Sequence, residues 1–382
     1  MTIAIVGVGE ADLVHRADIS EGAMIRQAID RALADAGLTA DAIDGIIIEG
    51  MATAQRAPID AVTASLGLKN RPFSAQVSIA GAGLVGAPEV ARLAIESGAA
   101  STVLVYFGMR LSAASGGPYA VHAEDPMKAA FEIPFGFYGQ PVYFGAMAQR
   151  YAHEYGLAPD DLFPIVDAAR QHAARTPGAL RARSLDVEEY LAADMVAEPL
   201  RKPDCCLMND SAVAYVMTSV ERARDLARPP VVVGGVAIAQ APVTQSQYFT
   251  QNPDYLSTPA TVSGPAAMQQ AGIGPSDVDI AELYDCFSIT ALLQLEDLGF
   301  APRGEGAAFA RETGVGPGGR LPLNTHGGLL AHSYALAGNH VVEAVRQLRG
   351  ERGDGQVPDA EIALVTGLGI PDHATLVLAV DR

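Results

Sequence analysis

The sequence predicts an α/β protein built from two similar halves, and three observations point to this fold class. Short β-branched runs alternate with segments whose apolar residues recur at helical spacing, which is typical of a layered α/β fold. The same order of strand, helix and strand returns later in the chain. Between the two parts, residues 115–225 break the alternation over a length too great for a simple connection.

In the first part, strands are expected at Thr2–Val8, Ile46–Ile48 and Thr102–Tyr106, because these runs are rich in β-branched residues. A helix is expected at Glu21–Leu38, where apolar residues recur at helical spacing, and a second one near Ala87–Ser97. Such an order favours a buried mixed or parallel sheet.

In the second part, Pro230–Ile238 and Ile280–Leu283 are predicted to be strands and Ala266–Ala271 the end of a helix. Short motifs match between the two parts at a constant offset of 235 residues, namely Ala36-Gly37-Leu38 with Ala271-Gly272-Ile273, and Ile43-Asp44 with Val278-Asp279. We therefore predict duplicated α/β halves, residues 1–228 and 229–382.

The stretch at about 115–225 is expected to be an inserted loop region within the first half. It contains the aromatic segment Phe135–Tyr138, an amphipathic helix from Tyr143 to Tyr155 and the basic segment Arg181–Ser184. We interpret this region as a cover over the first half that encloses the substrate.

Composition excludes several classes of function. The formal charge is −18, from 44 acidic and 26 basic residues, so neither nucleic acid nor an anionic membrane is an expected partner. No run approaches ~18 uncharged apolar residues, and no export signal opens the chain. Three cysteines are too few for a disulfide framework, and Cys205-Cys206 lacks the spacing of a zinc site. We expect a cytoplasmic protein.

Four segments carry motifs that indicate a family: Pro199–Ala212, Tyr284–Phe287, Asn324–Leu330 and Thr366–Gly369. They resemble, in order, the PLR-x-x-DCC-x-x-(S/N)DGAAA stretch, the HDCF motif, the Asn-x-x-Gly-Gly approach to the GHP motif, and the Cys-x-Gly motif. These motifs belong to the sterol-carrier-protein branch of the thiolase superfamily. The resemblance covers nearly the whole chain and implies the thiolase fold, with its layered αβαβα arrangement.

The departures from the family pattern concern its reacting groups. The nucleophilic cysteine of thiolases falls at Gly81, or at Gly83 after a two-residue slip, and the second cysteine falls near Gly367. The two family histidines are replaced by Tyr284 and Tyr334. Thiolysis through a covalent intermediate is therefore not expected, whereas two phenols retain groups for proton transfer.

This combination resembles the thiolase-like steroid side-chain aldolases of the lipid-transfer-protein type. The resemblance implies retro-aldol cleavage of a β-hydroxyacyl-CoA side chain to a ketone and a short acyl-CoA such as propionyl-CoA. Coenzyme A then enters as part of the substrate, and no permanently bound cofactor is expected. The resemblance also implies a homodimer, and a separate partner with a zinc ribbon and an OB-fold that would complete a heterotetramer.

Retro-aldol cleavage needs a base, stabilisation of a thioester enolate and an acid. Tyr284 and Tyr334 are expected to share the proton transfers, with their individual roles left open. Asp285 either orients Tyr284, acts as the base itself, or only caps backbone amides.

Backbone N–H groups near Gly81, Gly83 and Gly369 are expected to meet the enolate oxygen. We also assign His326 and Tyr248 to substrate binding, although a surface position is the alternative for Tyr248.

His326, His332 and His340 lie six and eight residues apart, which suits no common zinc pattern, so no metal is expected. Two alternatives remain open: a catalytically silent subunit that binds CoA esters or transfers lipids, and another non-thiolytic carbon–carbon bond enzyme on the same fold. Loss of both cysteines fits all three readings, and the paired tyrosines favour the aldolase.

Overall fold

The computed structural model describes residues 2–50, 57–69, 71–113 and 125–381. Its strands are β1 (Ile3–Glu10), β2 (Gly45–Glu49), β3 (Phe73–Val77), β4 (Thr102–Arg110), β5 (Met195–Ala197), β6 (Leu200–Arg201), β7 (Asp210–Ser219), β8 (Val231–Gln240), β9 (Ile280–Glu282), β10 (Ile362–Leu368) and β11 (Asp372–Val380). Its helices are α1 (Glu21–Ala36), α2 (Ile59–Leu66), α3 (Gly83–Glu96), α4 (Pro126–Phe131), α5 (Gln140–Tyr155), α6 (Phe163–Ala173), α7 (Val187–Ala192), α8 (Val220–Ala223), α9 (Gln245–Thr250), α10 (Ala260–Ala271), α11 (Ser288–Asp297), α12 (Gly306–Phe309), α13 (Gly328–Ala331) and α14 (Gly338–Leu348). The strands and helices predicted in the two parts are all present, most of them longer than the sequence indicated.

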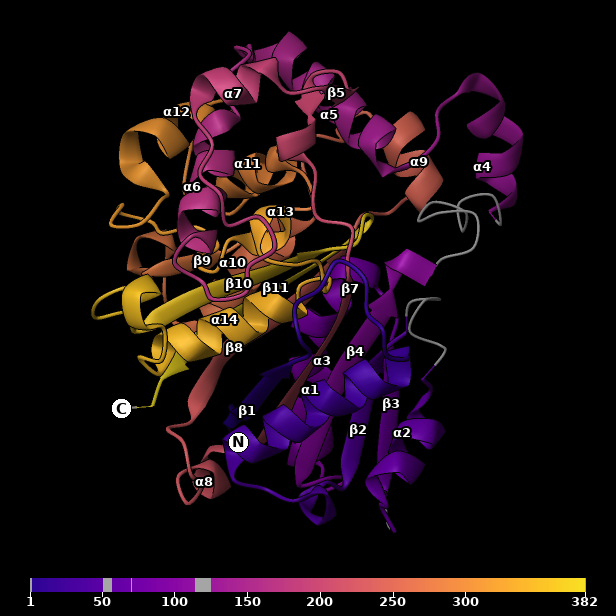
Figure 1. Cartoon of the computed structure of the whole chain (residues 1–382), viewed down its shortest axis with the longest axis vertical. Coiled ribbons are helices and arrows are strands. Elements are labelled where there is room, and N and C mark those ends of the chain that lie inside the picture. The colour runs from indigo at the N-terminus through magenta and orange to yellow at the C-terminus, as the bar shows by residue number, and fades with distance from the viewer. Residues whose placement is uncertain (1, 51–56, 70, 114–124, 382) are drawn as a thin grey trace.

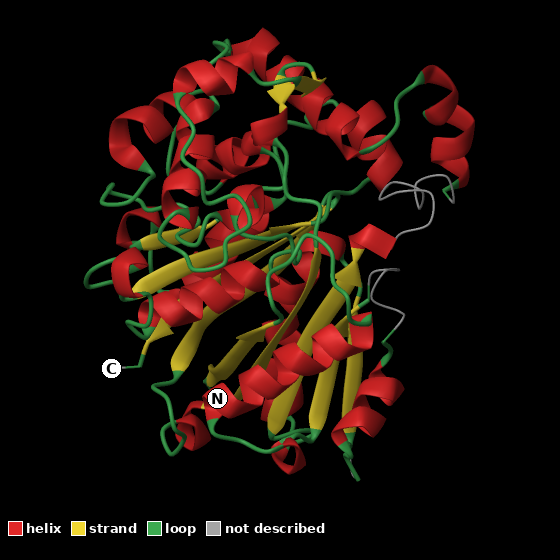
Figure 2. Ribbon diagram, in the orientation of Figure 1, coloured by secondary structure: helices red, strands yellow, loops and turns green. Residues whose placement is uncertain are grey.

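Nine strands form one mixed sheet in the order β3-β2-β4-β7-β1-β8-β11-β10-β9 (Figure 2). Reading outward from the junction of β1 and β8, each half repeats one pattern. Adjacent strands are antiparallel within the two runs β1-β7-β4 and β8-β11-β10. The strand after each run is parallel to the last strand of that run: β2 to β4, and β9 to β10. Within the sheet, the two halves meet where β1 pairs with β8, at Ala4 with Val232 and Ile5 with Val231. The topology therefore contains the internal repeat that the sequence predicts.

Helices separate and cover the two halves of the sheet. α3 packs against β2 and β4 of one half and against β8 and β11 of the other, and α14 likewise contacts strands of both halves (Figure 1). α1 covers the other face of the first half, and α10 that of the second. The expected αβαβα layers are confirmed.

Two glycines let α1 approach the sheet closely. A Cβ atom on Gly7 would lie 2.2 Å from the carbonyl oxygen of Ala32, and one on Gly9 would lie 2.2 Å from that of Ala28. Any side chain at either position would push the helix away from the strand.

The inserted region differs from the expectation in two respects. β7, which falls inside the predicted 115–225 range, is a fully buried strand between β1 and β4, so the insertion ends before Asp210. The described part of the insertion also packs on the second half, because α5 and α6 contact α11, and α6 contacts α13. The helix predicted at Tyr143–Tyr155 is α5, which begins at Gln140, and residues 115–124 lie outside the described residues.

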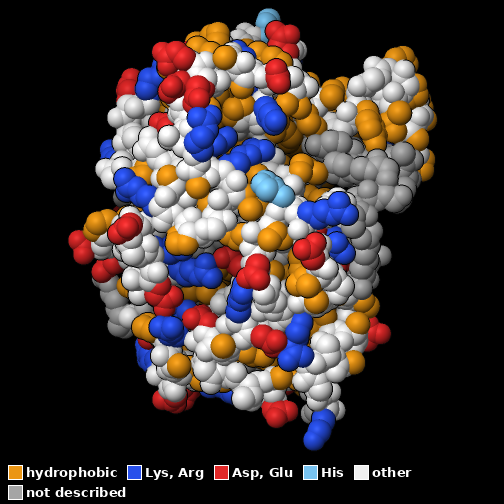
Figure 3. Space-filling model, in the orientation of Figure 1, with side chains coloured by type: hydrophobic (Ala, Val, Ile, Leu, Met, Phe, Trp, Pro, Cys, Tyr) orange, Lys and Arg blue, Asp and Glu red, His pale blue; other side chains and the backbone are white. Residues whose placement is uncertain are grey.

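Charged side chains of both signs are interspersed on the face drawn in Figure 3. Large apolar side chains are exposed on the segment around α4, which projects from the body of the molecule (Figures 1 and 3), with Phe131 and Phe135 67% and 82% exposed. Among the described residues, no helix is long and apolar enough to cross a lipid bilayer.

Candidate active site

The side chains of Tyr284 and Tyr334, 50 residues apart in the chain, meet in the structure. Their hydroxyl oxygens lie 3.1 Å apart, within hydrogen-bond distance. Tyr284 follows β9 and is only 3% exposed, and Tyr334 lies half-buried in the loop between α13 and α14. The two phenols that replace the family histidines thus face each other.

The backbone of Tyr284 is held on both sides by polar side chains from neighbouring elements. Its N–H donates to Thr366 Oγ1 at 2.9 Å, and its carbonyl oxygen accepts from Gln294 Nε2 at 2.8 Å. Thr366 Oγ1 in turn donates to Gln294 Oε1 at 2.6 Å. These bonds join the loop after β9 to β10 and α11, so the tyrosine cannot shift without breaking them.

The backbone of Tyr334 is held by the start of β7. Its N–H donates to Asn209 Oδ1 at 2.7 Å, and its carbonyl oxygen accepts from Ser211 Oγ at 2.6 Å. Both partners belong to the Asn209–Ala212 motif. The sequence assigned no role to Asn209, Thr366 or Gln294, although the motifs contained the first two, because only the fold brings them beside the tyrosines.

Gly81 lies directly against the ring of Tyr284. A Cβ atom on Gly81 would be 2.6 Å from Tyr284 Cζ and 2.2 Å from the carbonyl oxygen of Leu368. A Cβ atom on Gly367, the second cysteine position, would be 2.4 Å from the carbonyl oxygen of Gly81. Both positions where thiolases carry a thiol are therefore filled by neighbouring atoms, and one of them by the tyrosine ring itself.

Burial raises the pKa of the remaining thiols. The pKa of Cys205 and of Cys206 is raised to about 12, and that of Cys286 lies well above its ordinary value. A thiolate nucleophile is not available among them at neutral pH. Burial and the neighbouring Tyr334 likewise raise the pKa of Tyr284 well above the ordinary value of a phenol.

Two of the three backbone amides expected at the enolate oxygen are already engaged. The N–H of Gly83 donates to the carbonyl oxygen of Ala80, and that of Gly369 donates to Asp372 at 2.8 Å. The turn before α3 and the turn between β10 and β11 use these two amides, so an enolate oxygen near Gly83 or Gly369 would have to be met by other N–H groups of these turns. Gly81 stays a candidate, since it is the glycine against which Tyr284 packs.

Asp285 faces away from Tyr284. Its Oδ1 accepts the N–H of Leu329 at 2.8 Å and lies 3.2 Å from His340 Nε2. Its Oδ2 lies 2.0 Å from where a Cβ atom on Gly328 would be, so α13 begins directly on this carboxylate. The geometry matches the capping alternative rather than a role as base.

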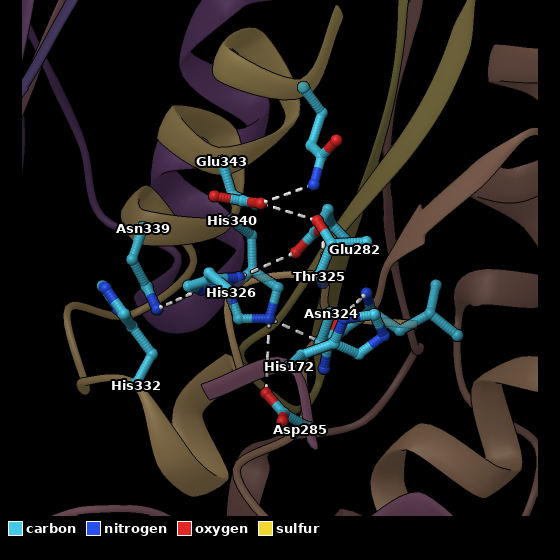
Figure 4. Close-up of polar contacts among 12 residues, drawn as sticks. His172, Glu282, Asp285, Asn324, Thr325, His326, His332, Asn339, His340 and Glu343 are labelled. Atoms are coloured by element: carbon cyan, nitrogen blue, oxygen red, sulfur yellow. Dashed lines mark hydrogen bonds and ion pairs between the residues drawn. The ribbon is translucent and has the colours of Figure 1, made fainter. Parts of the chain in front are cut away.

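His326 and Tyr248, both assigned to substrate binding, are buried. Tyr248 is fully buried, with its hydroxyl 3.2 and 3.1 Å from the carbonyl oxygens of Tyr255 and Ser257, so the surface position is wrong. His326 lies 3.2 Å from Glu282 and packs against His332 and His340 (Figure 4). In the described part of the chain, no group of three or more metal-ligating side chains is arranged to hold an ion.

A cavity of about 650 Å³ lies apart from the tyrosine pair. Its lining includes His172, Arg175, Asp279 and Arg320, and neither Tyr284 nor Tyr334 contributes to it. The cavity and the reacting groups thus lie in different places. We place the candidate site at the tyrosines, because two groups suited to proton transfer meet there beside Gly81.

Comparison with known proteins identifies the family. Residues 241–380 match the family model described as thiolase C-terminal domain-like. The chain is 33% identical to a steroid side-chain-cleaving aldolase of Thermomonospora curvata, over 99% of this chain and 98% of that protein. It is 34% identical to a 17-hydroxy-3-oxo-4-pregnene-20-carboxyl-CoA lyase of Mycobacterium tuberculosis, over 96% of this chain and 97% of that protein.

Solved structures give the same assignment. The structure titled Ltp2-ChsH2(DUF35) aldolase superposes with a TM-score of 0.92 at 32% identity, covering 100% of this chain and 98% of that one. Human mitochondrial 3-ketoacyl-CoA thiolase shares the fold alone, with a TM-score of 0.72 at 13% identity over 100% of this chain and 99% of that one. The chain therefore belongs to the thiolase superfamily and, within it, to the thiolase-fold aldolases, which are carbon–carbon lyases.

Proposed function

We propose that the protein cleaves the β-hydroxyacyl-CoA side chain of a steroid by a retro-aldol reaction, releasing a ketone and a short acyl-CoA such as propionyl-CoA. The observation that carries the proposal is the pair of phenols, 3.1 Å apart, of which Tyr284 packs against Gly81, a glycine that we assign to the position of the thiolase nucleophile. The names of the two relatives, an aldolase of steroid side chains and a lyase of a pregnene carboxyl-CoA, support the substrate class.

The reaction balances without any other reactant. The base takes the proton of the β-hydroxyl group, the Cα–Cβ bond breaks, and the β-carbon becomes the carbonyl carbon of the ketone. The electron pair of the broken bond passes into the thioester as an enolate, which then accepts a proton at Cα. One proton leaves oxygen and one arrives at carbon, so the enzyme ends in its starting state.

A hydrogen-bonded phenol pair suits this exchange. One tyrosine receives the hydroxyl proton while the other delivers its own to Cα, and the contact between Tyr284 and Tyr334 lets a proton pass between them. Because burial disfavours ionisation of Tyr284, a concerted transfer that never leaves a free phenolate is favoured. The enolate oxygen is placed at the N–H of Gly81, before the N-terminus of α3, where the helix dipole favours negative charge.

In this proposal coenzyme A is part of the substrate, and no permanently bound cofactor takes part. The tyrosines supply both proton transfers, so the chemistry calls for no redox or electrophilic group beyond them. Because the chain has a net charge of −18, the phosphates of the CoA ester need Lys or Arg side chains close to them. In this proposal the partner protein contributes some of these side chains.

We further propose that the protein is a cytoplasmic homodimer that binds a separate OB-fold and zinc-ribbon protein to form a heterotetramer. The structure titled Ltp2-ChsH2(DUF35) aldolase supports a partner of this kind. The exposed apolar side chains around α4 support assembly as well, since such surfaces on a protein generally mark interaction sites.

The experiment is to incubate the purified chain with a β-hydroxylated steroid side-chain CoA ester, with and without the co-encoded partner, and to follow release of the ketone and the acyl-CoA. Equal amounts of the two products are expected. Binding of the ester without cleavage under either condition would instead identify a silent binding subunit. Cleavage to any pair of products other than a ketone and an acyl-CoA would identify a different carbon–carbon bond reaction.

A further inference from the structure

We propose that Glu282 is a neutral carboxylic acid at the centre of a buried chain of polar contacts, and that Glu282 and His326 position the loop that carries Tyr334. This chain runs from Arg352 through Glu343, Thr325, Glu282, His326 and Asn339 to Ser333 (Figure 4 shows its central part). Only the kinetic test of this inference depends on the proposed function.

One end of the chain is an ion pair. Arg352 Nε lies 2.9 Å from Glu343 Oε2 and 3.1 Å from Oε1. Gln347 Nε2 also donates to Glu343 Oε1 at 3.0 Å. Arg352 is a permanent cation, and its contacts with both oxygens of Glu343 make Glu343 the ionised partner of the pair.

The hydroxyl of Thr325 then fixes the protonation of Glu282. Thr325 Oγ1 lies 2.8 Å from Glu282 Oε1 and 2.7 Å from Glu343 Oε1. A hydroxyl group has one proton and can donate to only one of two oxygens. The other contact needs a proton on a carboxyl group, and the ion pair with Arg352 keeps Glu343 ionised. The inferred proton is therefore on Glu282 Oε1, which accepts the N–H of Thr325 at 2.8 Å and donates to Thr325 Oγ1, while Thr325 donates to Glu343.

The tautomer of His326 follows from its other neighbour. Asn339 Nδ2 lies 3.0 Å from the carbonyl oxygen of Ser333, which only accepts, so the atom at this position is the amide nitrogen. The same nitrogen lies 3.0 Å from His326 Nε2, which must therefore be the acceptor. The proton of His326 is on Nδ1, and it faces Glu282 Oε2 at 3.2 Å.

The contact between His326 and Glu282 lacks the alignment of a strong hydrogen bond, since neither atom has a partner of good geometry. Its function is to set the orientation of the ring. Burial lowers the pKa of His326. Burial and the negative charge of Glu343 raise the pKa of Glu282. Both shifts agree with a neutral imidazole beside a neutral carboxylic acid.

The charged and titratable groups around this pair do not favour an ionised Glu282. Arg352, the cation beside the chain, is paired with Glu343. On the other side, Asp285 adds a negative charge that raises the pKa of Glu282 further. His340 lies beside Asp285, and His332 packs against the ring of His326, as drawn in Figure 4.

The consequence reaches the active site through Asn339. Its amide group joins His326 to the carbonyl of Ser333, the residue before Tyr334, while Asn209 holds the N–H of Tyr334. Ionisation of Glu282 would place a second buried carboxylate beside Glu343 and break the order of donors along the chain. The position of the Tyr334 hydroxyl would then change.

The direct test is infrared spectroscopy of the holoprotein at neutral pH, in which the carbonyl stretch of a protonated carboxyl group is resolved from carboxylate bands. The difference between wild type and Glu282→Gln should contain one such band. Glu296→Gln is the matched control, because Glu296 is a buried carboxylate paired with Arg303, and its difference spectrum should contain none. Absence of the band in the Glu282→Gln difference overturns the proposal, whatever the catalytic activity.

The kinetic test separates positioning from structure. The side chain of Glu282→Gln keeps one hydrogen-bond acceptor and one donor, so kcat should stay within about twofold of wild type. Because glutamine cannot ionise, this kcat should be maintained to higher pH than in wild type. Glu282→Ala and His326→Ala, if folded by thermal melting, should lower kcat about tenfold or more with KM of the CoA ester little changed. Wild-type kcat in Glu282→Ala, or loss of kcat in Glu282→Gln equal to that in Glu282→Ala, would refute the positioning role.

Discussion

Removing one hydroxyl oxygen at a time tests the tyrosine pair most directly. Tyr284→Phe and Tyr334→Phe each delete one atom of the 3.1 Å contact and leave the backbone bonds to Thr366 and Asn209 intact. Loss of a positioned proton-transfer group lowers the rate by about 10²–10⁴-fold. At 1.36 kcal/mol for each factor of ten, the barrier rises by about 2.7–5.4 kcal/mol.

The same change costs little stability. Loss of one hydrogen bond between two hydroxyl groups reduces the free energy of unfolding by about 1 kcal/mol. The two effects can therefore be separated, because kcat should fall by orders of magnitude while the melting temperature changes by a few degrees at most.

The assay is ketone release from the steroid CoA ester at saturating substrate, with substrate affinity measured separately on the inactive variants. Tyr106→Phe is the matched control, since it removes a buried hydroxyl bonded to the carbonyl of Ala57 and should leave kcat unchanged. If both active-site variants kept kcat within about twofold of wild type, well short of the effect of a catalytic acid or base, the proposed roles would be refuted.

Three further changes have defined outcomes. Gly81→Cys should not restore thiolysis and should lower lyase kcat about 100-fold, because its Cβ atom collides with the ring of Tyr284; acyl-enzyme detected by mass spectrometry would contradict this. Asp285→Asn should lower the free energy of unfolding in urea by about 1–3 kcal/mol through loss of the α13 cap, with kcat reduced far less than in Tyr284→Phe; an inactive but equally stable variant would show that Asp285 is the base. Burial lowers the pKa of His172 to about 4, whereas the same side chain in the unfolded chain binds a proton below about pH 6.5. The free energy of unfolding therefore decreases as pH falls from 6.5 toward 4. Between pH 7 and 5, the decrease should be about 2 kcal/mol smaller in His172→Gln than in wild type, and equal decreases would refute a buried neutral His172.

Sequence patterns predicted the repeated halves because each half carries its own local signals. The runs at Thr2–Val8 and Pro230–Ile238 became β1 and β8, the two strands at which the halves join. The extent of the insertion was not predictable in this way. β7 begins within the motif segment Pro199–Ala212, and its pairing with both β1 and β4 identifies it as a central strand.

The candidate site shows the same division. Tyr284 and Tyr334 were identified by their places in two motifs, but sequence spacing gave no reason for Asp285 to face α13. Tyr248 lies in a polar segment, yet its ring is covered by neighbouring residues and its hydroxyl meets backbone carbonyls. Burial of this kind depends on residues far away in the chain.

By itself, the sequence determined the fold class, the absence of thiols at both family positions and the presence of two phenols where the family has histidines. Only the tertiary structure decided that these phenols meet at 3.1 Å, that Tyr284 fills the space beside Gly81, and that the amides of Gly83 and Gly369 are already engaged. The physical reason is that motifs fix residue types, whereas hydrogen-bond partners and close contacts depend on segments brought together by the packing of two halves.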